Sequence, residues 1–138
     1  MGQLNITKRK ADGGVVVLDL LGEICLGNEN QQLKQTLRSL AEQNEKKIVL
    51  NLAGVTRIDS SGLGELVAGY ATVTKAGGDM KLLNLSGRAV ELMTITKLHT
   101  VFDVFDNEAA AVASFPLTAE DLQTVLIDPN KVNLKAVA

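Results

Sequence analysis

Hydrophobic and polar positions alternate near the start of the chain as they do in strands. Residues 4–7 alternate between apolar and polar side chains, which is typical of a strand with one buried face. Residues 15–21 are almost continuously apolar and rich in β-branched side chains, which predicts a buried strand. The turn sequence Ala-Asp-Gly-Gly at 11–14 separates the two segments. We therefore predict that the two strands form a hairpin. The basic residues 8–10 are expected to lead the chain into water after the first strand.

Helical and strand patterns then follow one another. Apolar residues recur at spacings of seven, four, three and one between positions 26 and 41, which predicts an amphipathic helix. The buried face of this helix is expected to consist of Leu26, Leu33, Leu37, Leu40 and Ala41. Short apolar runs at 48–52 and 80–85 have the length of strands, and Gly54 predicts a turn after the first of them.

The second half of the chain predicts three more helices. Apolar residues at helical spacing indicate a helix over residues 63–74, which the glycines of the sequence KAGGD would end. A short helix over residues 86–98 and an alanine-rich helix over residues 106–115 flank a short extended segment at 101–105. Serine and asparagine or aspartate at the starts of these last two helices are suitable caps.

The predicted order of elements is β-β-α-β-α-β-α-β-α. Strands that alternate with helices indicate an α/β fold, with a sheet that is parallel in its crossover part and covered by helices. Pro116 ends this unit, so that residues 1–115 are expected to form one domain and residues 116–138 a C-terminal extension. Thr118 and Asp121 resemble a capping box and predict one short helix in the extension.

Composition and charge narrow the classes of function. The chain has 138 residues, 46% hydrophobic and 22% charged, which suits a single globular domain. Its net charge of -2 and its scattered basic residues argue against binding along a nucleic-acid backbone. No apolar stretch approaches the roughly 18 residues of a membrane span, and no secretory signal is recognisable. The single cysteine, Cys25, cannot form an intramolecular disulfide, which fits the cytosol, and we expect a cytoplasmic protein.

The segment 57–64, Arg-Ile-Asp-Ser-Ser-Gly-Leu-Gly, joins a predicted strand to a predicted helix. A phosphate-binding loop of the G-x-G-x-x-G type would need glycine at the position of Val67. A nucleophile elbow would need G-x-S-x-G, which neither serine satisfies, and His99 is the only histidine for a catalytic triad. One histidine and one cysteine without clustered carboxylates do not make a metal site. We therefore expect no enzymatic activity, no catalytic residues, no cofactor and no metal.

The same segment has the residue types of a helix cap. Asp59, Ser60 and Ser61 are all favoured before a helix, and one of them is expected to accept a hydrogen bond from the first turn. Gly62 and Gly64 each cost about 1 kcal/mol relative to alanine inside a helix, which suggests that another group approaches the backbone closely. A regulatory phosphorylation site also fits, because a phosphate here would meet free N–H groups and the positive end of the helix dipole. Such a phosphate would repel a docked partner and so act as a release switch.

The longer sequence KKIVLNLAGVTRIDSSGLGELVAGYATVTKAGGDMKLLNLSGRAVELMTITKLHTVFDVFDNEAAAVASF resembles the STAS domain of bacterial anti-sigma factor antagonists. The shared pattern is a strand, V-x-x-I-D-S-S-G-L-G, a helix, a Gly-Gly pair, a strand, a short helix, F-x-x-F and a final helix. The resemblance covers residues 4–115. It implies a single STAS-type domain, with a four- to five-stranded mixed sheet and about four helices mainly on one face. It also implies a protein-binding switch without an active site of its own.

The resemblance also assigns roles within the segment. In the family, the unphosphorylated antagonist binds an anti-sigma factor serine/threonine kinase and frees a sigma factor, for example in a stress response. The kinase phosphorylates the serine after the motif aspartate, and a PP2C-type phosphatase removes the phosphate. That serine corresponds to Ser60, with its neighbour Ser61 as a minor acceptor. The partner-binding surface would comprise Asp59, Ser60, Ser61, Gly62, Leu63 and Gly64.

Two departures from the family pattern bear on the partners. Cys25 follows Gly-Glu-Ile where relatives often carry aspartate, which affects the identity of the partner more than the fold. Residues 116–138 extend beyond the usual end of the domain and could pack on it, mediate self-association such as a homodimer, or remain mobile. Two alternative functions are a scaffold subunit of a stressosome-like signalling assembly and an accessory subunit of a transporter.

Overall fold

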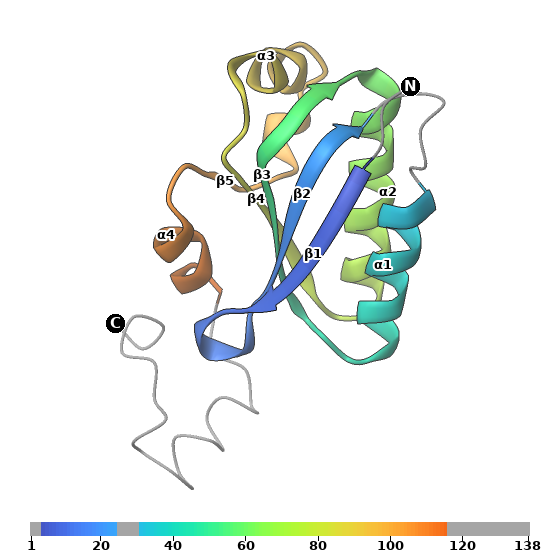
Figure 1. Cartoon of the computed structure of the whole chain (residues 1–138), viewed down its shortest axis with the longest axis vertical. Coiled ribbons are helices and arrows are strands. Elements are labelled where there is room, and N and C mark those ends of the chain that lie inside the picture. The colour runs from blue at the N-terminus through green and yellow to red at the C-terminus, as the bar shows by residue number, and fades with distance from the viewer. Residues whose placement is uncertain (1–3, 25–30, 116–138) are drawn as a thin grey trace, which may run out of the picture.

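Five strands form one mixed sheet in the computed structural model, which describes residues 4–24 and 31–115 (Figure 1). The strands lie side by side in their order along the chain: β1 (Leu4–Lys10), β2 (Val16–Ile24), β3 (Lys47–Ile58), β4 (Asp79–Leu83) and β5 (Val104–Phe105). β1 and β2 are antiparallel, whereas each pair of neighbours from β2 to β5 is parallel. The predicted hairpin, the parallel crossover strands and the predicted order of elements are confirmed.

Four α-helices accompany the sheet within the described part of the chain. They are α1 (Gln31–Glu42), α2 (Ser60–Lys75), α3 (Gly87–Ile95) and α4 (Glu108–Ala113), and short 3-10 turns lie at Asp12–Gly14 and Leu98–Thr100. α1 and α2 run side by side over one face, and α3 lies beyond the carboxyl ends of β3 and β4 (Figure 1). α4 packs against the opposite face of the sheet. The prediction that the helices lie mainly on one face therefore describes α1 and α2 but not α4.

The main core lies between the sheet and the helices α1 and α2. Val16, Leu18 and Leu20 of β2 belong to it, because alternate residues of a strand face the same side of a sheet. The buried leucines of α1 are Leu33, Leu37 and Leu40, as predicted. Ala41 is half-buried, and Leu26, predicted for the same face, lies outside the described residues.

A smaller apolar cluster on the opposite face holds α4 to the sheet. Val17 and Val49, from two neighbouring strands, meet Ala111 and Val112 of α4, and Phe115 belongs to the same cluster. Four of the six residues of α4 are alanine, so that its backbone can approach the sheet closely. The alternation along β2 therefore serves two apolar clusters, one on each face of the sheet.

β1 extends to Lys10, so that the prediction that residues 8–10 lead the chain into water is wrong for their backbone. Lys8 pairs with Leu18 and Lys10 with Val16. A basic side chain is compatible with an edge strand because its polar end reaches water, and both lysines are exposed. The charges therefore mark the outer edge of the sheet and not the end of the strand.

Gly54 lies within β3, which corrects the prediction of a turn after residues 48–52. The pairing of β2 with β3 shifts between Asp19 and Leu21 at this point, as it does at a β-bulge. A Cβ atom at Gly54 would lie 2.8 Å from the carbonyl oxygen of Leu20. Glycine is needed here for the close approach of two strands, a role that a sequence pattern does not distinguish from a turn.

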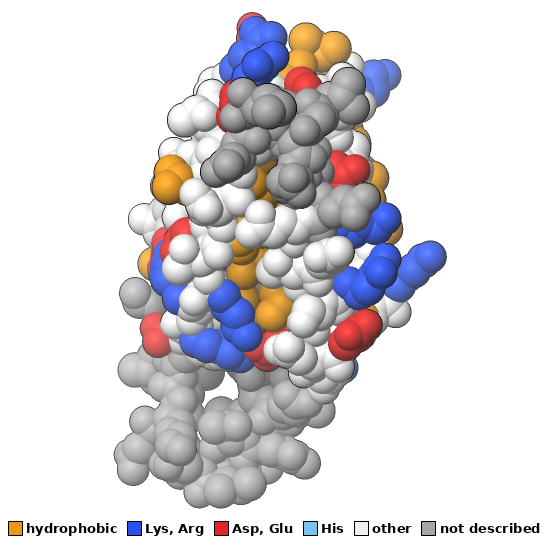
Figure 2. All heavy atoms as spheres, turned by 45° about the vertical axis from the view of Figure 1, so that its right-hand side comes forward, with side chains coloured by type: hydrophobic (Ala, Val, Ile, Leu, Met, Phe, Trp, Pro, Cys, Tyr) orange, Lys and Arg blue, Asp and Glu red, His pale blue; other side chains and the backbone are white. Residues whose placement is uncertain are grey.

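The side of the molecule that comes forward in Figure 2 carries charges of both signs. Cationic and anionic side chains are scattered among uncharged polar ones, and a narrow strip of hydrophobic side chains shows near the middle (Figure 2). A shallow hollow of about 360 Å³ between β1 and α1 is bordered by Lys8, Gln32 and Gln35, among others. Among the described residues on this face, the cationic side chains thus lie close to anionic ones.

Candidate functional site

The segment 57–64 lies where β3 ends and α2 begins. β3 runs to Ile58, and α2 starts at Ser60, so that a single residue connects the two elements. Ile24, the last residue of β2, is the parallel partner of Ile58. Binding sites of α/β proteins commonly lie at this carboxyl edge of the sheet. The segment 57–64 therefore lies at the carboxyl edge of β3, close to the end of β2.

Asp59 is the N-cap of α2, which confirms the prediction that one of Asp59, Ser60 and Ser61 caps this helix. Its backbone is extended, with φ -116° and ψ -176°. Its Oδ1 accepts a hydrogen bond of 2.9 Å from the backbone N–H of Gly62, and its carbonyl oxygen accepts one of 3.0 Å from Leu63. Because Asp59 meets the cap requirement, neither serine is needed for it.

Ser60 and Ser61 form the exposed start of α2. Among the described residues, neither hydroxyl has a hydrogen-bond partner. The first N–H groups of a helix lack partners within the helix and give this end a partial positive charge. The two hydroxyls are thus accessible at a helix end that favours an added negative charge.

Gly62 and Gly64 are explained by different surroundings. A Cβ atom at Gly62 would lie 1.9 Å from the carbonyl oxygen of Ile24, so that any larger residue would push α2 away from β2. A Cβ atom at Gly64 would meet nothing within 4 Å outside its own helix. The sequence suggested that both glycines make room for another group. At Gly62 this group is the protein's own strand β2, which corrects the interpretation of that glycine as space for a partner.

The six predicted partner-binding residues differ in their access to the surface. Ser60, Ser61 and Gly64 are exposed, and Asp59 is half-buried. Gly62 is buried, and Leu63 is only 1% exposed because its side chain belongs to the main core. Of the six residues, the two serines and Gly64 are thus open to solvent, on a helix start that Leu63 anchors to the core.

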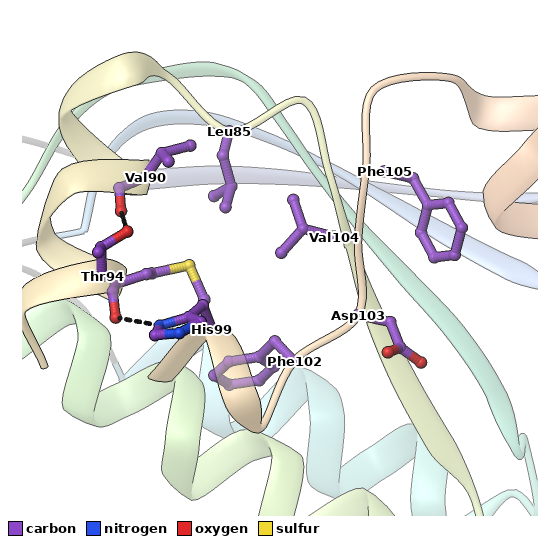
Figure 3. Close-up of a pocket in the computed structure, with 9 residues that line it drawn as sticks. Leu85, Val90, Thr94, His99, Phe102, Asp103, Val104 and Phe105 are labelled. Atoms are coloured by element: carbon purple, nitrogen blue, oxygen red, sulfur yellow. Dashed lines mark hydrogen bonds between the residues drawn. The ribbon is translucent and has the colours of Figure 1, made fainter. Parts of the chain in front are cut away.

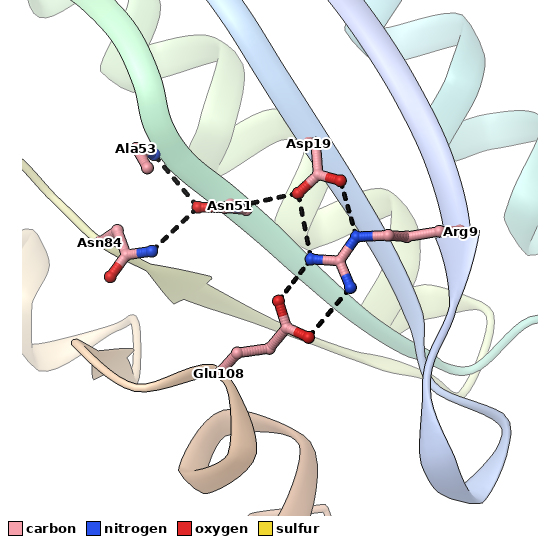
Figure 4. A network of polar contacts seen from close by, with 6 residues as sticks. All are labelled: Arg9, Asp19, Asn51, Ala53, Asn84 and Glu108. Atoms are coloured by element: carbon pink, nitrogen blue, oxygen red, sulfur yellow. Dashed lines mark hydrogen bonds and ion pairs between the residues drawn. The ribbon is translucent and has the colours of Figure 1, made fainter.

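A second polar cluster, which the sequence pattern did not predict, lies on the face of the sheet that α4 covers (Figure 4). Arg9 of β1 donates hydrogen bonds from Nε and Nη2 to Asp19 at 2.7 and 3.2 Å. It also donates from Nη1 to Glu108 at 2.9 Å, with a second, short contact from Nη2. Asp19 accepts a further bond of 2.8 Å from Asn51, whose Oδ1 accepts one of 3.1 Å from Asn84. The cluster ties α4 to three strands.

Charge pairing shifts the titration of this cluster. The hydrogen bonds from Arg9 hold the pKa of Asp19 and the pKa of Glu108 below their ordinary values, although partial burial opposes the shift. The same hydrogen bonds, to Glu108 first and Asp19 second, raise the pKa of Arg9. All three side chains are between 35% and 40% exposed, so that solvent screens the pairs.

Lys81 of β4 is a charged residue with only 5% of its surface exposed. Its Nζ donates to Asp103 at 2.7 Å, lies 3.3 Å from Asp79, and sits 5.2 Å from the centre of the Phe115 ring. Burial works against the charge of Lys81, but the hydrogen bond to Asp103 and the neighbouring carboxylates outweigh it and raise its pKa. Lys81 therefore stays charged and links β4 to the segment before β5 and to the end of α4.

The remaining candidates for chemistry are sparse in the described residues. His99 is exposed, and its Nδ1 lies 3.4 Å from the carbonyl oxygen of Met93. Within residues 4–24 and 31–115, no group of three or more His, Cys, Asp or Glu side chains is placed to hold a metal ion. No helix in that part of the chain has the length and hydrophobicity needed to cross a membrane. Cys25, where relatives often carry aspartate, lies outside the described residues.

Comparisons with known proteins agree with this geometry. The anti-sigma-B factor antagonist of Bacillus subtilis (strain 168) is 40% identical over 101 residues, which are 73% of this chain and 90% of that protein. An anti-sigma factor antagonist from Mycobacterium paratuberculosis has a similar structure, with a TM-score of 0.66 at 23% identity, over 80% of this chain and 93% of that one. The phosphorylated form of the Bacillus cell fate determinant SpoIIAA has a TM-score of 0.61 at 20% identity, over 78% and 96%. The two structural likenesses show the fold.

The family follows from the sequence match together with the fold. Residues 7–111 match the STAS domain, which is most of the chain and includes all of the segment between β3 and α2. The chain belongs to the STAS domain family, together with the bacterial anti-sigma factor antagonists that it resembles in sequence and structure.

Proposed function

We propose that this protein is an anti-sigma factor antagonist that binds an anti-sigma factor serine/threonine kinase through the start of α2. Phosphorylation of Ser60 by that kinase releases the kinase from the antagonist. A PP2C-type phosphatase removes the phosphate and restores binding. The observation that carries the proposal is the exposed hydroxyl of Ser60 at a capped helix start, in a chain 40% identical to a curated anti-sigma-B factor antagonist. The exchange would take place in the cytoplasm.

The site is suited to a switch that leaves the fold intact. Asp59 holds the first turn by its hydrogen bond to Gly62, and Leu63 anchors that turn in the core. A phosphate on Ser60 adds a charge of about -1.5 to -2 at neutral pH, which the helix dipole favours. The phosphoserine can therefore be accommodated by the protein itself without unfolding of α2.

The same phosphate opposes a docked partner. Its charge lies next to the carboxylate of Asp59, so that the helix start becomes strongly negative. A kinase surface that fits the neutral serine would have to desolvate this phosphate, and any acidic group on that surface would be repelled. Release then follows from charge and desolvation, without a conformational change in the antagonist.

Ser60 and Ser61 are alike in exposure, so that the choice between them rests on the family resemblance. An affinity pull-down with the unphosphorylated protein, followed by mass spectrometry, would identify the kinase. Incubation of the pair with ATP should then place phosphate on Ser60 in the wild type and in Ser61→Ala, but not in Ser60→Ala. Absence of phosphate from both serines of the wild type would contradict the proposed switch.

Aspartate substitutions test the release mechanism. Ser60→Asp should weaken kinase binding by at least about tenfold, which corresponds to about 1.4 kcal/mol. Ala71→Asp is a matched control, because Ala71 is exposed on α2 and a helical rise of 1.5 Å per residue puts it about 16 Å further along. Isothermal titration calorimetry with the kinase should show a loss for the first variant and wild-type affinity for the second. Equal affinity of Ser60→Asp and the wild type would count against the mechanism.

A further inference from the structure

An apolar groove opens between α3 and β5 (Figure 3), and no residue of the segment 57–64 lines it. Its volume is about 330 Å³, which is at the small end of the range for binding pockets. Figure 3 shows Leu85, Val90 and Val104 pointing into the space between the two elements. Val90 is 47% exposed and Val104 is 41% exposed, so that within the described residues the groove lacks an apolar cover.

The last described residue, Phe115, belongs to the cluster on the opposite face of the sheet and is linked to the groove through Lys81 and Asp103. Phe115 lies 5.2 Å from Nζ of Lys81, and that Nζ lies 2.7 Å from Oδ2 of Asp103. Asp103 is one of the residues that line the groove. The centre of the Phe115 ring therefore lies within about 8 Å of Oδ2 of Asp103.

The sequence after Phe115 contains an apolar segment at a suitable distance. Residues 122–127, Leu-Gln-Thr-Val-Leu-Ile, hold four apolar side chains and no charge. Six residues separate this segment from Phe115, and six residues span up to about 20 Å when extended. The segment can thus reach the groove without any change in the domain.

We propose that the groove between α3 and β5 is the docking site for residues 122–127 of the same chain. The tether favours this occupant, because a short linker gives a segment an effective concentration on the order of 1 mM. A free partner of equal affinity, or a second copy at micromolar concentration, cannot compete at that level. The docked segment covers Val90 and Val104 and leaves the start of α2 open to its partner.

Hydrogen exchange of the full-length protein tests the docking. A segment at about 1 mM effective concentration that binds with a dissociation constant of about 0.1 mM should exchange its amide protons about tenfold more slowly. Val90→Glu, which places a charge in the groove, should abolish this protection of residues 122–127. Ile95→Glu is the matched control, because Ile95 is a 76% exposed residue of α3 that does not line the groove.

Three results would overturn the proposal. The first is equal exchange of residues 122–127 in the wild type and in Val90→Glu, with both proteins shown to be folded by circular dichroism. The second is protection that fades on dilution, since docking within one chain is independent of concentration and a second copy is not. The third concerns the double variant Leu122→Ser with Leu126→Ser, which should shift the NMR methyl resonances of Val90 and Val104 but not that of Ile95. Unchanged resonances of Val90 and Val104 in this variant would contradict the docking.

Discussion

Two glycines at the start of α2 stand two positions apart and serve different purposes. Gly62 lets the helix touch the carbonyl oxygen of Ile24, whereas Gly64 faces open space. The sequence shows that both glycines are unfavourable in a helix, but it does not show what lies opposite each one. Similarly, the residue types predicted a cap at this position, and only the structure selects Asp59 for it.

Alanine substitutions at the two glycines should change the free energy of unfolding in opposite directions. Gly62→Ala should destabilise the domain by about 3 kcal/mol, because its Cβ would clash with backbone that cannot move freely. Gly64→Ala should stabilise it by about 1 kcal/mol, because alanine is the better helix former and the site is open. Urea unfolding of both variants provides the measurement, and similar effects of the two would refute the assigned roles.

Gly64→Ala also separates stability from partner binding. If the kinase docks over the exposed start of α2, a methyl group at Gly64 intrudes on the interface while it stabilises the free protein. We therefore expect weaker kinase binding from a more stable variant. Calorimetric titration would show this, and unchanged affinity would place Gly64 outside the contact.

At the scale of elements, α4 is held to the sheet by charges as well as by its apolar face. Arg9 joins β1 and β2 to Glu108, the first residue of α4, across 99 positions of sequence. Because such a pair leaves no local pattern, the sequence predicted α4 as an element but not its place on the sheet. Lys81, which meets Asp103 and Phe115, was missed for the same reason.

Glu108→Gln should lower the stability by about 0.5–1 kcal/mol at pH 7, since the pair is partly exposed and screened. The pKa of Glu108 lies below its ordinary value in the folded protein, so that its contribution is present at neutral pH. That contribution begins to decline once the pH falls below the ordinary glutamate pKa of 4.5, and it is lost as the pH falls through the lower pKa of the folded state.

The measurement is urea unfolding of the wild type and Glu108→Gln at pH 7 and pH 3. The difference between them should shrink at the lower pH. Glu91→Gln, at an exposed position on α3, serves as the control and should match the wild type at pH 7. A wild-type advantage over Glu108→Gln that is undiminished at pH 3 would show that the ion pair is not its source.

At the scale of the whole molecule, the order of elements and the hairpin followed from the sequence because each element has its own hydrophobic period. The extents of β1 and β3 did not follow from the sequence. Basic residues interrupt the hydrophobic pattern in β1 and a glycine interrupts it in β3, while the backbone pairing continues through both. Local patterns report which side of an element is buried, and long-range pairing decides where a strand ends.

The assembly of the whole protein distinguishes the proposed antagonist from a scaffold subunit. An antagonist that offers the start of α2 to one kinase should have the mass of one or two chains in light scattering. A very large particle at micromolar concentration would instead favour a stressosome-like assembly, in which the same serine would regulate assembly.

The affinity of the partner kinase for the protein singly phosphorylated on Ser60, compared with the unphosphorylated protein, tests the central claim most directly. We expect the phosphorylated form to bind at least about tenfold more weakly, the ratio that corresponds to about 1.4 kcal/mol. Its melting temperature should stay close to that of the unphosphorylated form, because Asp59, Gly62 and Leu63 hold the helix start in place. Equal affinity of the two forms would contradict the account, and so would release that occurs only when the fold melts.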